Sequence, residues 1–216
     1  MTLRLHYHPL SSFCMKVLVA LYENGTPFEP VFVDLSKKAD RETFYKLWPI
    51  GKFPLIEDTA RDWMVPESSI IIEYLDQHYP GPAKLVPADA DRARQVRMRD
   101  RFFDLNIQIH MQKIVGDRER PADSKDPLGV NQARAQMRTA CTLVESDIGD
   151  KWLMGDAFTM ADCSAAPALY YADKVMPLAA DFPKTAAYLG RLSERPSFAR
   201  VLKEAEPYLA MFPKET

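Results

Sequence analysis

A change of hydrophobic period at residues 79–87 limits the folds open to this chain. The segment is Tyr-Pro-Gly-Pro-Ala-Lys-Leu-Val-Pro, whose three prolines and one glycine are poorly compatible with a helix or a central strand. Before it, stretches with the two-residue period of strands alternate with helical stretches, whereas only helical periodicity follows it. We therefore predict an α/β domain over residues 1–79, a linker over residues 80–87 and an all-helical domain over residues 88–216.

The order of elements before the linker predicts a thioredoxin-like layer. Residues 3–7 alternate apolar and polar side chains, Pro9 ends this strand, and a helix follows it. A second strand over residues 28–35 completes a βαβ unit, which is right-handed in nearly all proteins. The rest of the domain is predicted as a short charged helix, two short strands and a helix, over residues 40–47, 54–57, 63–65 and 67–78.

Beyond the linker, apolar residues recur at helical spacing in five segments, 88–115, 130–148, 159–174, 182–194 and 197–206. Residues 116–129 form the longest predicted loop. At the start of the third segment, Thr159 and Asp162 have the spacing of a capping box, with aspartate in place of glutamate. We expect this pair to be structural.

Composition excludes several classes of function. The chain has 216 residues, 47% of them hydrophobic, and a net charge of -2, so nothing favours binding to nucleic acid or to an anionic membrane. No apolar run approaches the roughly 20 residues of a membrane span, and the N-terminus lacks the apolar core of a signal peptide. Cys14, Cys141 and Cys163 form no metal or CxxC spacing, and His6 and His8 lack a third ligand. We expect a cytoplasmic protein without a metal.

Two segments in the N-terminal domain predict a site for a small peptide. In residues 51–55, Pro54 lies at the mouth of an apolar strand, where a cis X-Pro bond turns the preceding backbone outward. In residues 65–70, an acid and a hydroxyl lie at the first turn of a helix, where unpaired N–H groups favour a carboxylate. Lys52 is well placed to pair with a second carboxylate.

A hydroxyl pair opens the first helix. In a thioredoxin-like layer this turn carries the reactive sulfur of dithiol enzymes, at a helix N-terminus that stabilises an anion. Ser11 or Ser12 can instead donate its O–H to the thiolate of a ligand. Lowering a thiol pKa by about two units requires roughly 2.7 kcal/mol of preference for the anion. Alternatively, either serine is only an N-cap, and Cys14 is a buried apolar residue.

Together these motifs resemble the cytosolic glutathione S-transferases of the serine type, theta-like or zeta-like, over nearly the full chain. The resemblance implies that Ser11 stabilises the glutathione thiolate. It also implies a set of glutathione-binding residues: Lys52 at the glycyl carboxylate, the backbone of Phe53 before Pro54 at the cysteinyl part, and Glu67 and Ser68 at the γ-glutamyl end.

The resemblance leaves the identity of the hydroxyl donor open. Ser12 follows Ser11 directly and is a second candidate, and Tyr7 lies close to where other classes carry a catalytic tyrosine. The helical domain is expected to supply a pocket for an apolar electrophile, lined by Phe103, Ile107, Met111 and Tyr208, although helical spacing alone is equally compatible with a core.

The activity implied by the resemblance is conjugation of the glutathione thiolate to a small apolar electrophile, as in detoxification, by a homodimer. Two alternatives use the same scaffold. One is a glutathione-dependent disulfide reductase or peroxidase, and the other is a non-catalytic binding module that holds a protein partner.

Overall fold

The computed structural model describes residues 2–215 and contains a mixed four-stranded sheet in this range. The strand order is β2-β1-β3-β4, with β1 parallel to β2 and antiparallel to β3, and β3 antiparallel to β4. The strands are β1 (Leu3–Tyr7), β2 (Glu29–Phe32), β3 (Leu55–Asp58) and β4 (Trp63–Pro66). The sequence-based prediction of a thioredoxin-like layer is confirmed.

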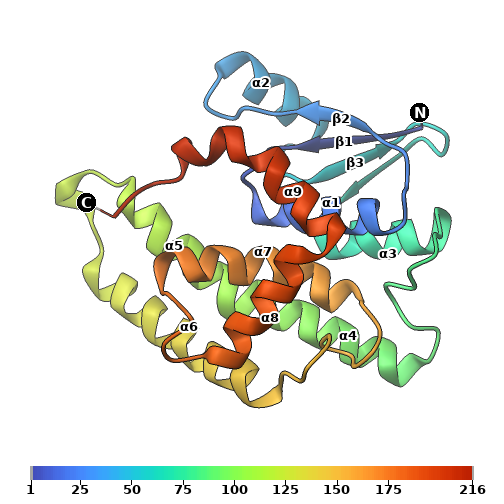
Figure 1. Cartoon of the computed structure of the whole chain (residues 1–216). Helices are drawn as coiled ribbons and strands as arrows, with labels where there is room; N and C mark the ends of the chain where they lie inside the picture. The colour runs from blue at the N-terminus through green and yellow to red at the C-terminus, as the bar shows by residue number, and fades with distance from the viewer. Residues whose placement is uncertain (1, 216) are drawn as a thin grey trace.

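Helices cover both faces of this sheet. The helix α2 (Lys38–Leu47) lies on the outer face, and α1 (Ser12–Glu23) and α3 (Ser68–His78) lie between the sheet and the C-terminal helices (Figure 1). Because α1 packs against α7 and α9, the apolar interior continues from the sheet into the helical part. The N-terminus of α1 therefore lies where the two parts of the chain meet.

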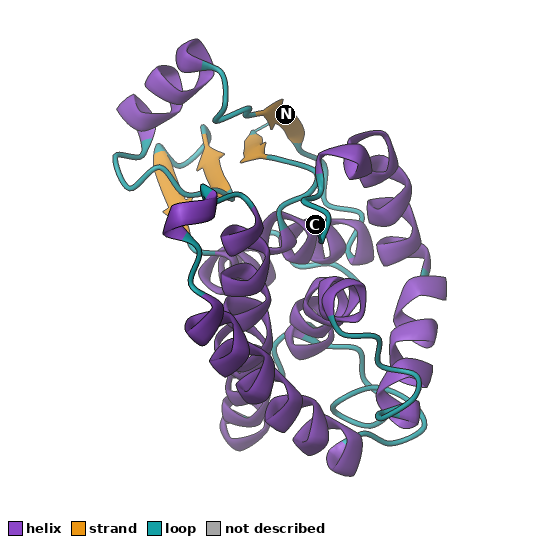
Figure 2. Cartoon of the chain, turned by 90° about the vertical axis from the view of Figure 1, so that its left-hand side faces the viewer, coloured by secondary structure: helices purple, strands orange, loops and turns teal. Residues whose placement is uncertain are grey.

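The C-terminal part is all-helical, as predicted, and the strands lie at one end of the molecule (Figure 2). Its elements are α4 (Ala90–Phe103), a π-helical turn η1 (Asp104–Gln108), α5 (Ile109–Arg118), a 3₁₀ turn η2 (Ala122–Ser124), α6 (Pro127–Asp147), α7 (Met160–Val175), α8 (Pro183–Glu194), α9 (Pro196–Ala205) and a 3₁₀ segment η3 (Glu206–Met211).

The boundaries of these helices differ from the predictions in two places. The helix predicted over residues 88–115 is interrupted by η1, in which the N–H of Ile109 donates to the carbonyl of Asp104, five residues back. The loop predicted over residues 116–129 is shorter, because α6 begins at Pro127. The side chain of Asp126 caps α6 by accepting from the N–H of Gly129, and a proline fits the first position of a helix.

The predicted capping box at the start of α7 is present. The side chain of Thr159 accepts from the backbone N–H of Asp162, and a carboxylate oxygen of Asp162 accepts from the N–H of Thr159 at 2.8 Å. Asp162 also accepts from the N–H of Leu153 and the hydroxyl of Tyr188. These bonds tie α7 to α8 and to the preceding loop, which supports a structural role for the motif.

A buried ion cluster joins the two parts of the chain, and the sequence analysis did not anticipate it. The ammonium group of Lys16 on α1 lies 2.6 Å from a carboxylate oxygen of Asp100 and 2.8 Å from one of Asp104. The hydroxyl of Ser69 on α3 accepts from Lys16 and donates to Asp100, and Ser164 on α7 donates to Asp104. We call these five residues the Lys16 cluster.

Candidate functional site

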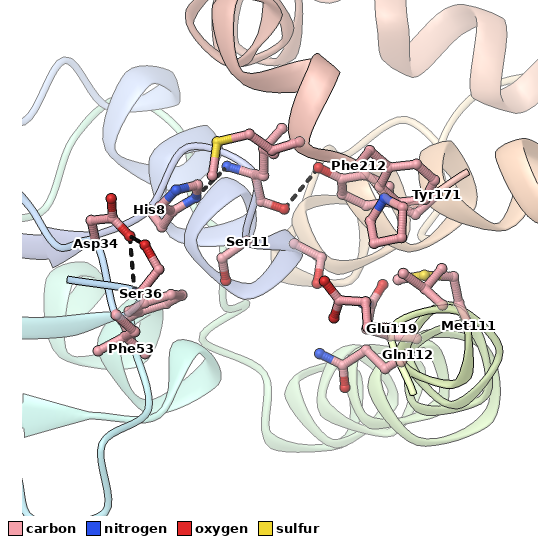
Figure 3. A pocket seen from close by; sticks show the side chains of 18 residues that line it. His8, Ser11, Asp34, Ser36, Phe53, Met111, Gln112, Glu119, Tyr171 and Phe212 are labelled. Carbon is pink, nitrogen blue, oxygen red and sulfur yellow. Dashed lines mark hydrogen bonds between the residues drawn. The ribbon is translucent and has the colours of Figure 1, made fainter. Parts of the chain in front are cut away.

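A cleft of about 660 Å³ opens at the N-terminus of α1, between the sheet, α5 and the C-terminal tail (Figure 3). Tyr171 on α7 stacks on Phe212 of the tail and donates its hydroxyl to the carbonyl of Leu10, which fixes the loop before α1. The lining is mixed in polarity: apolar side chains from α5, α7 and the tail face His8, Ser11, Ser12, Asp34, Ser36, Gln108, Gln112 and Glu119.

Ser11 lies in this cleft and caps α1. Its Oγ accepts from the backbone N–H of Cys14 at 3.3 Å. This bond uses the hydroxyl as an acceptor, so its O–H remains available to donate to an anion in the cleft. Capping and stabilising a thiolate are therefore compatible roles of one side chain.

The two alternative hydroxyl donors, Ser12 and Tyr7, differ in their position relative to the cleft. Ser12 is the first residue of α1; it is largely buried but lines the cleft beside Ser11. Tyr7 lies on β1, packs against the core and is not among the residues that line the cleft. Burial raises the pKa of the Tyr7 hydroxyl. The structure thus brings Ser11 and Ser12 to the cleft and leaves Tyr7 outside it.

His8 is a cleft residue that the sequence analysis considered only as a metal ligand. Its Nδ1 accepts from the N–H of Leu10 at 3.2 Å, which assigns the ring proton to Nε2. Burial lowers the pKa of the imidazole, so the ring is neutral at neutral pH. The ring also contacts Phe53 and Tyr208. Its place after β1 is the one signal that could have marked it in the sequence.

A second, smaller cavity adjoins the cleft at Phe53. The Phe53–Pro54 peptide bond is cis. Neither the backbone N–H nor the carbonyl of Phe53 is hydrogen-bonded to another residue within residues 2–215. Phe53 lines both the cleft and the smaller cavity, which Lys52, Glu67 and Ser68 also line. The predicted peptide-binding residues therefore lie around the smaller cavity, and we call the two adjoining cavities together the groove.

The far end of this groove is the N-terminus of α3. Glu67 precedes the helix with a φ of 67°, a left-handed conformation that is uncommon for a residue with a side chain and often marks a functional site. Glu67 makes no side-chain cap, and the N–H groups of Ser68, Ser69 and Ile70 have no backbone partner in the described part of the chain. These N–H groups and the helix dipole suit a carboxylate.

Of the four predicted electrophile-pocket residues, one lies at the cleft and three do not. Met111 lines the cleft. Phe103 and Ile107 are 1% and 0% exposed and belong to the core, so their helical spacing reflects packing and not a pocket wall. Tyr208 stacks on Phe32 and contacts His8 without lining the cleft. The tail closes the cleft through Met211, Phe212 and Pro213 instead.

The cysteines do not contribute to the cleft. Cys14, Cys141 and Cys163 are free and buried. Burial raises the pKa of the Cys14 thiol to about 12, so it stays protonated. Within residues 2–215 no cluster of histidine, cysteine and acidic side chains has the arrangement of a metal site. Over the same residues no helix is both long and apolar enough to cross a membrane.

Comparison with known proteins agrees with this architecture. Residues 5–83 match the glutathione S-transferase N-terminal domain, and residues 117–191 match the glutathione S-transferase C-terminal domain. A glutathione S-transferase from Pseudomonas putida is 28% identical, over 97% of this chain and 96% of the relative. A stringent starvation protein A homolog from Pasteurella multocida is 27% identical, over 90% of this chain and 87% of the relative.

A solved structure shows the same arrangement. The crystal structure of a glutathione S-transferase from Methylobacterium radiotolerans, in complex with glutathione sulfonate, superposes with a TM-score of 0.81 at 28% identity. The match covers 92% of this chain and 93% of that protein. With both domain profiles matched over more than half of its length, this chain belongs to the glutathione S-transferase family.

Proposed function

We propose that this protein conjugates glutathione to a small electrophile in the manner of the serine-type classes. The hydroxyl of Ser11 stabilises the glutathione thiolate. The observation that carries the proposal is the groove, formed by two adjoining cavities that Phe53 lines, one at Ser11 and the other at the N-terminus of α3. A steady-state assay with glutathione and benzyl chloride tests it, with S-benzylglutathione as the expected product. Absence of product from a folded protein contradicts it.

The groove matches the chemical groups of glutathione along its length. The thiolate lies at the start of α1, where Ser11 donates and the helix dipole favours an anion. The unpaired backbone of Phe53 pairs with the cysteinyl residue, and Lys52 meets the glycyl carboxylate. At α3, the N–H and hydroxyl of Ser68 hold the γ-glutamyl carboxylate, and Glu67 pairs with the γ-glutamyl amino group. The 28% identical glutathione S-transferase from Methylobacterium radiotolerans, in complex with glutathione sulfonate, supports glutathione as the ligand.

Substitution of Ser68 tests the γ-glutamyl end of the groove. We expect Ser68→Ala to raise KM for glutathione roughly 10-fold with kcat nearly unchanged, because a hydrogen bond of about 1.5 kcal/mol to a charged group is lost equally in the ground and transition states. Steady-state kinetics with varied glutathione measure this. Ser36→Ala, on the cleft side, serves as a control, and an unchanged KM in Ser68→Ala contradicts the placement.

Substitution of Cys14 distinguishes conjugation from the activity of a reductase that uses its own cysteine. A disulfide reductase that works through its own thiol needs an accessible sulfur of lowered pKa. Cys14 has neither, so we expect Cys14→Ala to retain conjugation within about twofold after correction for folded protein, at a stability loss of roughly 1 kcal/mol for the lost buried atom. Loss of turnover in folded Cys14→Ala would favour the glutathione-dependent reductase or peroxidase.

An exposed apolar face beside the groove supports a homodimer. Four apolar side chains, one each on α3, α4, η1 and α5, are about half exposed: Ile70, Met98, Leu105 and Ile109. Three of them also line a cavity of about 630 Å³ that Glu67 and Ser68 share. A partner subunit on this face covers apolar surface that is otherwise in water. The three buried free thiols fit a reducing, cytoplasmic location.

A second candidate is a module that binds a protein partner without catalysis, since two of the relatives are named stringent starvation protein A homolog and not transferase. Such a module has no need for the groups that line the groove. Retention on immobilised glutathione and elution by free glutathione discriminate between the two. A folded protein that passes through the column unbound supports the module.

A further inference from the structure

The peptide group between Leu10 and Ser11 is hydrogen-bonded at both of its polar atoms. Its carbonyl accepts from the hydroxyl of Tyr171 at 2.7 Å (Figure 3). Its N–H donates to the carbonyl of His8 at 3.0 Å. No backbone N–H in residues 2–215 donates to the carbonyl of Leu10, so Tyr171 is the partner that satisfies it there. A peptide group held at both atoms cannot rotate freely, and its orientation is passed on to the next residue.

The next residue is Ser11, whose hydroxyl faces the cleft. Its φ of -73° and ψ of 119° are typical of a helix N-cap. Its Oγ accepts from the N–H of Cys14 at 3.3 Å, and its carbonyl accepts from the N–H of Met15 at 2.8 Å. These two bonds tie Ser11 to α1 on one side, and the preceding peptide group fixes it on the other. The direction of the hydroxyl therefore depends on both.

Tyr171 brings this support from the helical part of the chain, 161 positions from Leu10. It is 2% exposed, and its ring stacks on that of Phe212 with 5.4 Å between the ring centroids. The helix that carries it, α7, is buried over residues 160–169 and packs against α1. A reacting group is held most precisely by rigid, packed elements. The loop that bears Ser11 is thus anchored to the least mobile kind of support.

The hydroxyl of Tyr171 is not free to serve as the donor to the sulfur. A tyrosine hydroxyl has one proton, and here that proton goes to the carbonyl of Leu10. A phenylalanine at this position keeps the stacking on Phe212 but leaves the carbonyl without its partner. Because an offset of about 1 Å at a reacting group can cost roughly 10²-fold in rate, this one bond is able to influence the chemistry.

We propose that Tyr171 is a positioning residue, which holds the Leu10–Ser11 peptide group so that the hydroxyl of Ser11 points at the glutathione sulfur; this inference rests on the proposed conjugation activity. In this role Tyr171 acts only through Ser11. Without its hydroxyl, Ser11 still caps α1, but its O–H samples several directions and donates to the thiolate for only part of the time.

The variant that tests this role is Tyr171→Phe. We expect the pKa of the bound glutathione thiol to rise by about one unit, half of the lowering that the site supplies, so that kcat/KM with benzyl chloride falls roughly threefold at pH 7 and roughly 10-fold in acid. The ultraviolet absorbance of the bound thiolate, followed against pH, measures the thiol pKa without turnover. A loss of folded protein alone would lower the rate equally at every pH and leave this pKa in place.

A double-mutant cycle with Ser11→Ala shows whether Tyr171 acts through Ser11. The double variant should be as active as Ser11→Ala alone, because no hydroxyl is left to position. The same factor of loss in both backgrounds overturns the role, since Tyr171 would then act on the reaction independently. An active wild type with an unchanged thiol pKa in Tyr171→Phe overturns it as well.

Tyr22→Phe is the matched control. The hydroxyl of Tyr22 donates to Glu204 at 2.7 Å and also ties α1 to a C-terminal helix, but at the opposite end of α1. This variant should leave the thiol pKa and kcat/KM unchanged. Equal shifts in the two variants overturn the inference, because any loosening of α1 would then have the same effect. A wild-type protein that forms no conjugate overturns the conjugation activity itself, and the inference with it.

Discussion

We expect Ser11→Ala to lower kcat/KM for glutathione conjugation roughly 25-fold at pH 7, and roughly 10²-fold well below both thiol pKa values, because about 2.7 kcal/mol of preference for the thiolate is lost. The side chain removed is the one whose Oγ caps α1 and whose O–H faces the cleft. Without this donor, the pKa of the bound thiol returns toward that of a free cysteine, and a smaller fraction of it is ionised.

The pH dependence distinguishes this effect from a loss of binding. A lowered thiol pKa maintains the rate until the pH falls through that pKa, so the acidic limb of the wild-type profile lies at low pH. In Ser11→Ala the limb moves to higher pH, and the two rates converge in alkaline solution, where the thiol is ionised without help. A parallel drop at every pH contradicts the role.

Two further variants test which hydroxyl donates to the thiolate. Ser11→Thr keeps both a hydroxyl and a cap, and should restore most of the activity. Ser12→Ala removes the neighbouring hydroxyl and should leave the acidic limb in place. If Ser12→Ala moves the limb and Ser11→Ala does not, the donor is Ser12.

We expect Lys16→Met to destabilise the protein by about 3–5 kcal/mol at neutral pH, because it leaves two buried carboxylates without their cation. The side chains of Lys16 and Asp100 are each 1% exposed, so water cannot replace the lost partner. The Lys16 cluster also links α1 to α3 and α4, and its loss weakens the junction where the cleft lies. Denaturant unfolding followed by tryptophan fluorescence measures the free energy of unfolding.

The sign of the pH effect follows from the carboxylates. Burial raises the pKa of Asp100 even with Lys16 present, and removal of Lys16 raises it further. A raised pKa in the folded state means that the folded protein binds more protons than the unfolded chain, so stability falls as pH rises through the window between the two values. The loss in Lys16→Met is therefore larger at neutral pH than in acid.

Arg94→Met is the control for Lys16→Met. Arg94 and Asp91 are also 2.6 Å apart, but their side chains are 74% and 78% exposed. An exposed pair contributes about 0–1 kcal/mol, so this variant should be nearly as stable as wild type. Equal losses in the two variants contradict the account of the buried cluster.

Most of the fold could be predicted from local sequence patterns. The two-residue period of β1, the breakers before α4 and the capping spacing of Thr159 and Asp162 each act over a few neighbours, and the elements they predict are present. The predicted cis bond before Pro54 and the helix predicted from Glu67, which begins one residue later at Ser68, belong to the same class of short-range signal.

Long-range placement could not be predicted in the same way. Phe103 and Ile107 share a helical face, but spacing does not reveal whether a face is covered by other helices or by a cavity. Lys16 and Asp100 are 84 positions apart, and no pattern along the chain pairs them. Tyr171 is 161 positions from Leu10, and only the fold brings its hydroxyl to that carbonyl.

The most direct test of the glutathione thiolate at α1 is calorimetric titration of glutathione in two buffers of different ionisation enthalpy, at a pH below the ordinary thiol pKa. Glutathione should bind with release of up to about one proton per site, and S-methylglutathione, which has no thiol proton, should bind with none. Absence of binding heat, or the same proton balance for both ligands, contradicts the account.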